Sequence, residues 1–430
     1  SLRLFDFSRD FLPDYRGNYR GFCGNHFRFG TDFTPCTCGS GNPLDFGIPF
    51  SIGGKMQRME LVVPCHFGLE AVCKKEIQDL GYDVHTVSDG KVHFIGDAEA
   101  IVRANIFLRT GERVLLKLGS FHAESYEDLF QGTKALPLEE YLPKDASFWV
   151  TKASSVKSKL FSPRDIQSVM KKAMVDRMAS YYHQSFFEEH GAKYPFRVSL
   201  YKDEVLLCLD TSGDSLHKRG YRLKMGKAPI KETLAASLIL LSKWREDAPF
   251  VDPMCGAGTF PIEAAMIAAK IAPGMHRHFT AEAWENLIPK KEWDYALEEA
   301  GDEIDRSLLE SKKNSYGKMV DIQGYDIDPA MIPVCRENAE RAGVGKLIHF
   351  QEREVGKMSH SKRGGLILTN PPYGERIEDK RNLPLLYTEL REAYEDLDDW
   401  RLCLITAYEQ AEKYLGKADK NRKLYNGMMK

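Results

Sequence analysis

Four consecutive residues, Asn370-Pro371-Pro372-Tyr373, carry the clearest chemistry in this sequence. They follow the apolar run 366–369, and two prolines cannot continue a strand, so a stiff loop should leave that strand at its carboxyl end. Ligands of open α/β sheets bind at this edge. An amide side chain, an imide carbonyl and an aromatic ring suit a flat ring with an exocyclic amine. We therefore expect all four residues to be catalytic.

A second motif, Phe-Val-Asp-Pro-Met-Cys-Gly-Ala-Gly-Thr, spans residues 250–259. A short apolar strand ends at Asp252, and a turn of small residues leads into a predicted helix at 261–271. Gly256 and Gly258 would let the backbone approach a ligand, and the first-turn amides of the helix favour negative charge. Asp252 is placed to meet an ammonium group. A dinucleotide-binding dehydrogenase is excluded, because the third glycine of its fingerprint is replaced by proline.

A third element reads as a strand at 322–326 followed by a helix at 330–342. An acid at the end of the second strand of a nucleotide-binding sheet can accept both ribose hydroxyls. Asp326 is the candidate for this role, and Ile327 would pack on the base of the nucleoside.

Together these motifs resemble those of class I S-adenosylmethionine-dependent methyltransferases. Asn-Pro-Pro-Tyr is similar to the motif of members that act on amino groups of bases or of protein glutamine. Asp-Pro-Met-Cys-Gly-Ala-Gly-Thr is similar to their S-adenosylmethionine loop. After the third strand the family often has an aspartate that meets the adenine amine, where this chain has a glutamate. The resemblance implies S-adenosyl-L-methionine as cofactor, held by Pro229, Asp252, Gly256, Gly258, Thr259, Asp326, Ile327, Glu354 and Asn370.

The junction sequences Leu-His-Lys-Arg-Gly-Tyr-Arg at 216–222 and Ala-Pro-Ile-Lys-Glu-Thr-Leu-Ala at 228–235 are more specific. They closely resemble the same segment of bacterial 23S ribosomal-RNA guanine-N2 methyltransferases, and the match runs from about Met59 to Lys430. The resemblance implies methyl transfer to a guanosine N2 in RNA, with 23S ribosomal RNA or a ribosomal precursor as partner.

Upstream of the junction, a strand at 147–151, a lysine-rich loop that starts at Lys152, a helix at 164–181 and a hairpin at 197–210 look like a THUMP module, which binds RNA through shape and phosphate contacts. A solvated charged face would be the ordinary reading of such a loop, and a linker packed against both domains is an equal alternative for the junction residues. The expected RNA-binding residues are Lys152, Lys157, Lys159, Arg164, Lys171, Lys172, His217 and Arg219.

The predicted fold is α/β, a Rossmann-like class I methyltransferase domain preceded by an α+β ferredoxin-like and THUMP region. Residues 1–55 show no period and are treated as an unpatterned leader, a candidate artefact left out of the predicted fold. The family usually finishes with an antiparallel hairpin, whereas this sequence stops at Met428-Met429-Lys430, so the last strand is expected to be cut short. The remaining predicted domains are 56–120 (ferredoxin-like), 121–212 (THUMP) and 213–430 (methyltransferase).

Composition fits a multi-domain enzyme of the cytoplasm. The chain has 430 residues, 43% of them hydrophobic, and a formal net charge of −2, which argues against a wholly basic nucleic-acid coat. The sequence contains no run of about 20 apolar residues, so no membrane span is predicted. Nine scattered cysteines suggest reduced thiols. The group Cys23, His26, Cys36 and Cys38 lacks a Cys-x-x-Cys pair, so no metal is predicted. No stable protein partner is expected.

Three alternative functions remain open at this stage. Guanine-N2 methyltransferases of transfer RNA have the same two-domain plan and differ in substrate. DNA adenine-N6 methyltransferases share Asn-Pro-Pro-Tyr, although the upstream segment argues for RNA. A non-enzymatic RNA-binding assembly factor is disfavoured by the intact cofactor and amine motifs.

Overall fold

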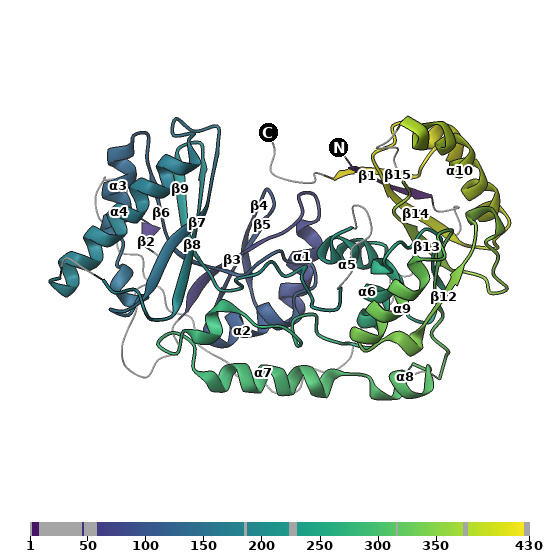
Figure 1. Cartoon of the computed structure of the whole chain (residues 1–430), viewed down its shortest axis with the longest axis horizontal. Coiled ribbons are helices and arrows are strands. Elements are labelled where there is room, and N and C mark those ends of the chain that lie inside the picture. The colour runs from purple at the N-terminus through teal and green to yellow at the C-terminus, as the bar shows by residue number, and fades with distance from the viewer. Residues whose placement is uncertain are drawn as a thin grey trace, which may run out of the picture.

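The computed structural model describes residues 2–7, 45–46, 58–184, 187–222, 230–314, 317–372 and 377–424. Two β-sheets organise these residues, one in each half of the elongated molecule shown in Figure 1. The first sheet is mainly antiparallel and the second is mainly parallel. No helix among these residues is long and apolar enough to cross a membrane.

The first sheet begins as a ferredoxin-like β–α–β–β–α–β unit, as predicted. Its strands lie in the order β4-β5-β3-β6, and both helices pack their buried residues into one core beneath the sheet. The aspartate before the second helix, Asp97, caps it by accepting the N–H of Ala100 at 3.0 Å. The elements are β3 (Met59–Pro64), α1 (Glu70–Asp79), β4 (Val84–Ser88), β5 (Lys91–Gly96), α2 (Ala98–Phe107) and β6 (Leu115–His122).

The THUMP-like elements extend this same sheet beyond β6. Strand β9 pairs with β6, β8 pairs antiparallel with β9, and β7 pairs parallel with β8. A two-residue strand, β2 (Asp45–Phe46), also pairs with β6. The elements are α3 (Tyr126–Ala135), η1 (Leu138–Glu140), β7 (Ser147–Val156), α4 (Pro163–Tyr182), β8 (Lys193–Tyr201) and β9 (Glu204–Asp210).

One predicted boundary in this region is wrong. The sequence pattern predicts that the strand ends at Thr151 and that Lys152 lies in a lysine-rich loop. In the structure β7 continues to Val156, with a register shift between Val150 and Lys152. Lys152 is therefore a strand residue, because the parallel partner β8 supplies hydrogen bonds along this extra length.

The second sheet has the order β12-β11-β10-β13-β14-β1-β15, with the first five strands parallel. Apolar cores lie on both faces, one under α5, α6 and α9 and the other under α10. The strands are β10 (Phe250–Asp252), β11 (Ile322–Asp326), β12 (Ile348–Glu352), β13 (Leu366–Thr369), β14 (Arg401–Thr406) and β15 (Lys420–Leu424). The helical elements are α5 (Glu232–Leu241), α6 (Thr259–Ala268), α9 (Met331–Arg341), η3 (Gly345–Leu347), η4 (Val355–Lys357), α10 (Ile377–Glu395) and α11 (Ala411–Leu415).

The amino-terminal strand β1 (Leu2–Phe7) corrects the treatment of the first residues as a leader outside the fold. It lies between β14 and β15 and is antiparallel to both. Phe5 and Phe7 are buried in the core under α10, and Leu4 is buried in the opposite core. The alternation over six residues was too short to predict a strand so far from its partners in sequence.

The segment between α6 and β11 forms a strap along the lower side of the molecule in Figure 1. It contains η2 (Thr280–Ala283), α7 (Lys290–Glu303) and α8 (Arg306–Ser311). Trp284 is fully buried and stacks on Tyr194 of β8, with ring centroids 4.9 Å apart. Glu299 of α7 pairs with Arg103 of α2 at 2.6 Å. The strap thus fastens the second half of the chain to both parts of the first.

We expect Trp284→Ala to lower the free energy of unfolding by about 3–5 kcal/mol, because it removes a fully buried indole. Circular dichroism during urea unfolding measures this loss. The control is Tyr295→Ala on α7, whose side chain is 61% exposed, and which should stay within about 0.5 kcal/mol of wild type. Equal effects of the two substitutions would contradict the fastening role of Trp284.

Candidate active site

The loop between β10 and α6 forms the first wall of the site. Gly256 and Gly258 both have left-handed backbone, with φ of 52° and 84°. A Cβ at Gly258 would lie 3.2 Å from the Phe350 ring and 3.4 Å from Cys335 Cβ, so a side chain would be crowded there. Nothing among the described residues lies within 4 Å of a Cβ built on Gly256. The Gly256 backbone is therefore open to a ligand at the start of α6.

Helix α9 supports this loop from behind through two side chains that the sequence analysis missed. The Cys335 thiol donates to the Gly256 carbonyl at 2.9 Å, and the Asn338 amide donates to the Ala257 carbonyl at 3.1 Å. Their spacing of three residues on one helix face is the only signal the sequence offered. Cys255 lies 3.8 Å from Cys335, sulfur to sulfur. That neighbour and burial raise the pKa of Cys255 well above its ordinary value, which fits a turn residue better than a nucleophile.

Asp326 ends β11 and ties the second strand to the glycine loop. One carboxylate oxygen accepts the Gly256 N–H at 2.9 Å, and the other accepts the Asp328 N–H at 2.9 Å. Each oxygen keeps further acceptor capacity, which suits a pair of vicinal hydroxyls. Ile327 follows with a side chain that is 69% exposed, an apolar surface beside the acid.

Asp252 ends β10 inside the protein, where it is only 2% exposed. Burial raises the pKa of its carboxyl to about 7, against the opposing effects of the Thr369 hydroxyl and the Met254 N–H, while the charge of Asp326 raises it further. Among the described residues no lysine or arginine forms an ion pair with Asp252. The site therefore offers a buried acid suited to a ligand's ammonium group, and the donor set fits the cofactor that the motifs imply.

The amine-recognition loop begins where β13 ends, on the other side of β10. The parallel register places Val251 opposite Ile367, so Asp252 and Asn370 leave neighbouring strands at the same edge. Asn370 is half-buried, Pro371 is buried and Pro372 is exposed. The predicted residues Tyr373 and Pro229 lie outside the described residues.

Two predicted cofactor residues are placed less favourably. The Thr259 hydroxyl is buried and accepts a hydrogen bond from Arg222 at 2.6 Å, so its side chain serves the domain junction. Glu354 is exposed and pairs with Lys357 at 2.9 Å. The structure describes both Glu354 and Asp326, and no hydrogen bond joins their side chains. The prediction for these two side chains therefore gains no support from the geometry.

Comparison with known proteins assigns the chain to a protein family. Three family models match it, described as RlmL ferredoxin-like domain (residues 60–115), THUMP domain (123–210) and RMKL-like methyltransferase domain (219–430). The Bacillus subtilis (strain 168) protein named "Putative RNA methyltransferase YpsC" is 44% identical over 378 residues, covering 87% of this chain and 95% of the relative. The chain belongs to the THUMP-containing, RMKL-like family of RNA methyltransferases.

Two further matches of this RMKL-like methyltransferase, one relative and one solved structure, are consistent with this family. The Ribosomal RNA large subunit methyltransferase K/L of Cellvibrio japonicus (strain Ueda107) is 34% identical over 381 residues, covering 84% of this chain and 49% of the relative. The crystal structure of SMU.472, complexed with SAH, is 40% identical with a TM-score of 0.79, covering 87% of this chain and 96% of that one. S-adenosyl-L-methionine is the cofactor of this family fold, and the predicted fold class is confirmed.

The expected RNA-binding lysines of the methyltransferase do not form one surface. Lys152 lies on β7, on the face of the sheet away from the helices. Lys159 pairs with Glu124, and Lys171 on α4 contacts Glu189 at 2.6 Å and the Phe148 carbonyl at 2.5 Å. The other three candidates are exposed: Lys157 lies in the turn after β7, Arg164 at the start of α4 and Lys172 along that helix.

The position of Arg219 contradicts the prediction that its side chain contacts RNA. Its side chain is 2% exposed and lies 3.5 Å from the buried Glu263. Its guanidinium also donates to the carbonyls of Leu216 at 2.7 Å and Arg109 at 2.5 Å. A guanidinium held this way cannot reach a phosphate, so the alternative of a packed linker is correct for Arg219.

His217 is half-buried in the same linker, 3.8 Å from Glu112. Burial alone would raise the pKa of Glu112, but hydrogen bonds from His217 and His66 and the charge of His66 hold it well below its usual range. Thr233 at the start of α5 also donates to this carboxylate. Glu112 therefore joins the ferredoxin-like part to the catalytic part, and His217 serves this junction.

We expect Asp326→Ala to weaken S-adenosylhomocysteine binding by about 10- to 100-fold, the loss of one or two hydrogen bonds to a charged acceptor. Isothermal calorimetry measures it. Asp328→Ala is the matched control, because its exposed carboxylate accepts only the local Ala330 N–H at 2.9 Å among the described contacts. Unchanged affinity of the Asp326 variant would remove the proposed ribose contact.

The raised pKa of Asp252 gives a pH dependence with a defined sign. Its folded-state pKa of about 7 lies above the ordinary 3.8, so its contribution to stability is present at low pH and is lost as the pH rises toward 7. Binding of an ammonium group needs the ionised form. Cofactor affinity should therefore fall about tenfold per pH unit below 7.

Calorimetry between pH 5.5 and 8 tests this dependence. In Asp252→Asn the affinity should be lower at pH 8 and nearly independent of pH. A wild-type affinity that stays flat across this range would contradict the role of Asp252.

Proposed function

We propose that this methyltransferase transfers a methyl group from S-adenosyl-L-methionine to the exocyclic N2 amine of a guanosine in RNA, with 23S ribosomal RNA as the substrate. One observation carries the proposal. Asn370 and Pro371 follow β13 at the sheet edge where the neighbouring β10 ends in Asp252 and the glycine loop. The amine-binding groups and the cofactor loop thus share one edge.

The chemistry asks the protein mainly to position its substrate. When bound, S-adenosyl-L-methionine supplies a methyl group on a sulfonium, which is already a strong electrophile. Guanine N2 is a poor nucleophile because its lone pair is delocalised into the ring. The Asn370 side-chain oxygen and the Pro371 carbonyl accept the N–H groups of this amine, favour a pyramidal nitrogen and aim its lone pair. Alignment of this kind supplies much of the rate.

The target base must leave its helix to reach this edge. Tyr373 stacks on the extruded base in our proposal and offsets part of an unstacking cost of a few kcal/mol. The neighbouring Pro372 is exposed, which leaves the approach to the loop open on that side.

One observation supports RNA as the substrate, and a second favours ribosomal RNA among RNAs. A THUMP-like unit lies in one continuous sheet with the ferredoxin-like unit, and the Cellvibrio relative is named for the large-subunit ribosomal RNA. We likewise propose that the reaction takes place in the cytoplasm, because the proposed substrate is a ribosomal RNA.

The test incubates the enzyme and labelled S-adenosyl-L-methionine with deproteinised 23S ribosomal RNA, transfer RNA or DNA. Mass spectrometry of the nucleosides should find N2-methylguanosine in the ribosomal RNA. N6-methyladenine in DNA, or N2-methylguanosine in transfer RNA alone, would overturn the proposal.

In the same assay we expect Asn370→Ala to lose at least 10²-fold in methyl transfer, because it removes an acceptor that aligns the amine. Its affinity for S-adenosylhomocysteine, measured by calorimetry, should fall by less than tenfold, or about 1.4 kcal/mol, because Asn370 is only one of the residues expected to hold the cofactor. Near-normal turnover by this variant would refute the role of Asn370.

A further inference from the structure

The first sheet has one face covered by helices and one face without them among the described elements. Side chains alternate across it, as strand geometry requires. On β6, Leu116 and Leu118 enter the main core under the helices, whereas Leu115 lies on the other face. We call this second face the open face of the first sheet.

The open face holds a cavity of about 640 Å³ where three parts of the chain meet. The ferredoxin-like part contributes Val62 and Lys91, and the THUMP-like part contributes Lys152 and Arg197. Lys231, immediately before α5, comes from the catalytic domain. A cavity of this size falls in the range of small-molecule sites and can hold one nucleotide.

The floor of this cavity is apolar. Val62, Leu115 and Cys208 form a small cluster of their own, with Leu206 packed against it. Burial raises the pKa of the Cys208 thiol to about 12, so the floor carries no thiolate at neutral pH. A flat, weakly polar ring could lie against such a floor without losing hydrogen bonds.

The cations around the floor are incompletely neutralised. Lys91 donates to the Ser199 hydroxyl at 3.0 Å, which carries no charge. Lys152 forms no ion pair within the part of the chain that the structure describes. Partial burial and the nearby charges of Arg197 and then Arg113 and Lys231 lower the pKa of Lys152. Such mutual repulsion is relieved when an anion binds among the cations.

The acids that line the cavity do not cancel this charge. Lys231 lies 3.4 Å from Glu112, but that carboxylate also contacts His66 at 3.0 Å. Asp89 is the other acidic lining residue. Against these two acids stand four lysine or arginine side chains, which are Lys91, Lys152, Arg197 and Lys231.

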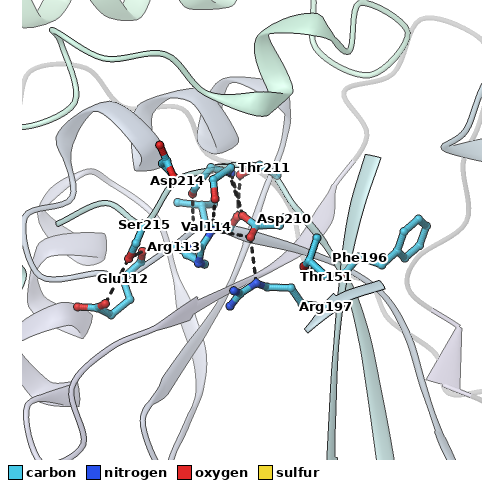
Figure 2. A network of polar contacts seen from close by, with 12 residues as sticks. Glu112, Arg113, Val114, Thr151, Phe196, Arg197, Asp210, Thr211, Asp214 and Ser215 are labelled. Carbon is cyan, nitrogen blue, oxygen red and sulfur yellow. Dashed lines mark hydrogen bonds and ion pairs between the residues drawn. The ribbon is translucent and has the colours of Figure 1, made fainter. Parts of the chain in front are cut away.

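Arg197 lines the cavity and is held in place by Asp210, as the polar network in Figure 2 shows. Asp210 accepts a hydrogen bond from Arg113 at 2.6 Å and forms an ion pair with Arg197, whose Nε lies 3.0 Å away, so one carboxylate serves two guanidinium groups. This trio keeps a net positive charge. It also lines a neighbouring hollow of about 230 Å³ together with Trp149, whose side chain is 37% exposed.

We propose that the cavity on the open face binds one unpaired nucleotide of the RNA substrate, with its base on the apolar floor and its phosphate among Lys91, Lys152 and Arg197. The inference rests on the proposed function in taking RNA as the substrate. The exposed rings of Tyr201, 44% exposed at the rim, and of Trp149 offer stacking surfaces for flanking bases. Because Lys231 precedes α5, this anchor is fixed relative to the catalytic sheet.

The test measures RNA affinity without methyl donor, using the full chain and a 23S ribosomal RNA fragment with single-stranded ends. Lys152→Ala and Lys91→Met, each alone and together, remove one or two phosphate contacts. The double variant should bind at least tenfold more weakly, and the slope of log affinity against log salt should fall by about 0.7 per lost contact. Lys134→Ala on α3, a lysine on the helix-covered side that pairs with Asp176, is the charge-matched control and should change neither quantity.

A second measurement does not depend on the folding of these variants. A photoreactive benzoylphenylalanine at Tyr201 should crosslink to RNA, whereas the same group at exposed Tyr181 on α4 should not. Wild-type affinity and salt slope in the double variant, or crosslinking from Tyr181 alone, would overturn the proposal.

The two proposals fail separately. RNA binding that depends on Lys152, without formation of N2-methylguanosine, would retain the cavity and reject the guanine-N2 activity. N2-methylguanosine formed with unchanged RNA affinity in the double variant would do the reverse.

Discussion

The hydrogen bond from the Gly256 N–H to the Asp326 carboxylate is the contact on which the catalytic edge depends. It joins the loop after β10 to the end of β11. The parallel partner on the other side of β10 is β13, which ends at Thr369 and leads directly into Asn370. Parallel neighbours present their carboxyl ends at one edge of a sheet. Three motifs spread over residues 252–370 therefore meet there, and Cys335 and Asn338 hold the loop in place from α9.

A second constraint fixes the RNA-binding half relative to this edge. Arg219 and Glu263 are both buried, and a buried charge must be paired to be tolerated. Glu112 gathers contacts from the linker and from α5, and the strap stacks Trp284 on Tyr194 of the THUMP-like unit. These contacts place the open face and the catalytic edge in one framework. RNA held by the first half is then presented to the second at a fixed separation.

The sequence predicted the positions of those site residues that belong to contiguous motifs. The strand ends at Asp252 and Asp326, and the one just before Asn370, could be predicted, because a glycine turn, an acid after an apolar run and a pair of prolines each constrain the backbone locally. The ferredoxin-like order followed from the alternation of strand and helix patterns in the same way.

The sequence was uninformative where a residue's role depends on distant partners. Arg219 was predicted to contact phosphate, and no sequence pattern indicated its burial, because that burial is set by Glu263 and by carbonyls elsewhere in the chain. Lys152 looked like a loop residue because the pairing that extends β7 comes from β8. The strand at Leu2–Phe7 was missed because both partners lie some 400 positions away.

The most direct test of the central claim is a crystal structure of this methyltransferase with S-adenosylhomocysteine. Our account predicts that the ribose hydroxyls meet Asp326, that the amino group meets Asp252 and that the sulfur faces the Asn370 side chain across a space open to solvent. A sulfur directed away from Asn370, or an Asn370 loop closed off from solvent in that complex, would contradict it.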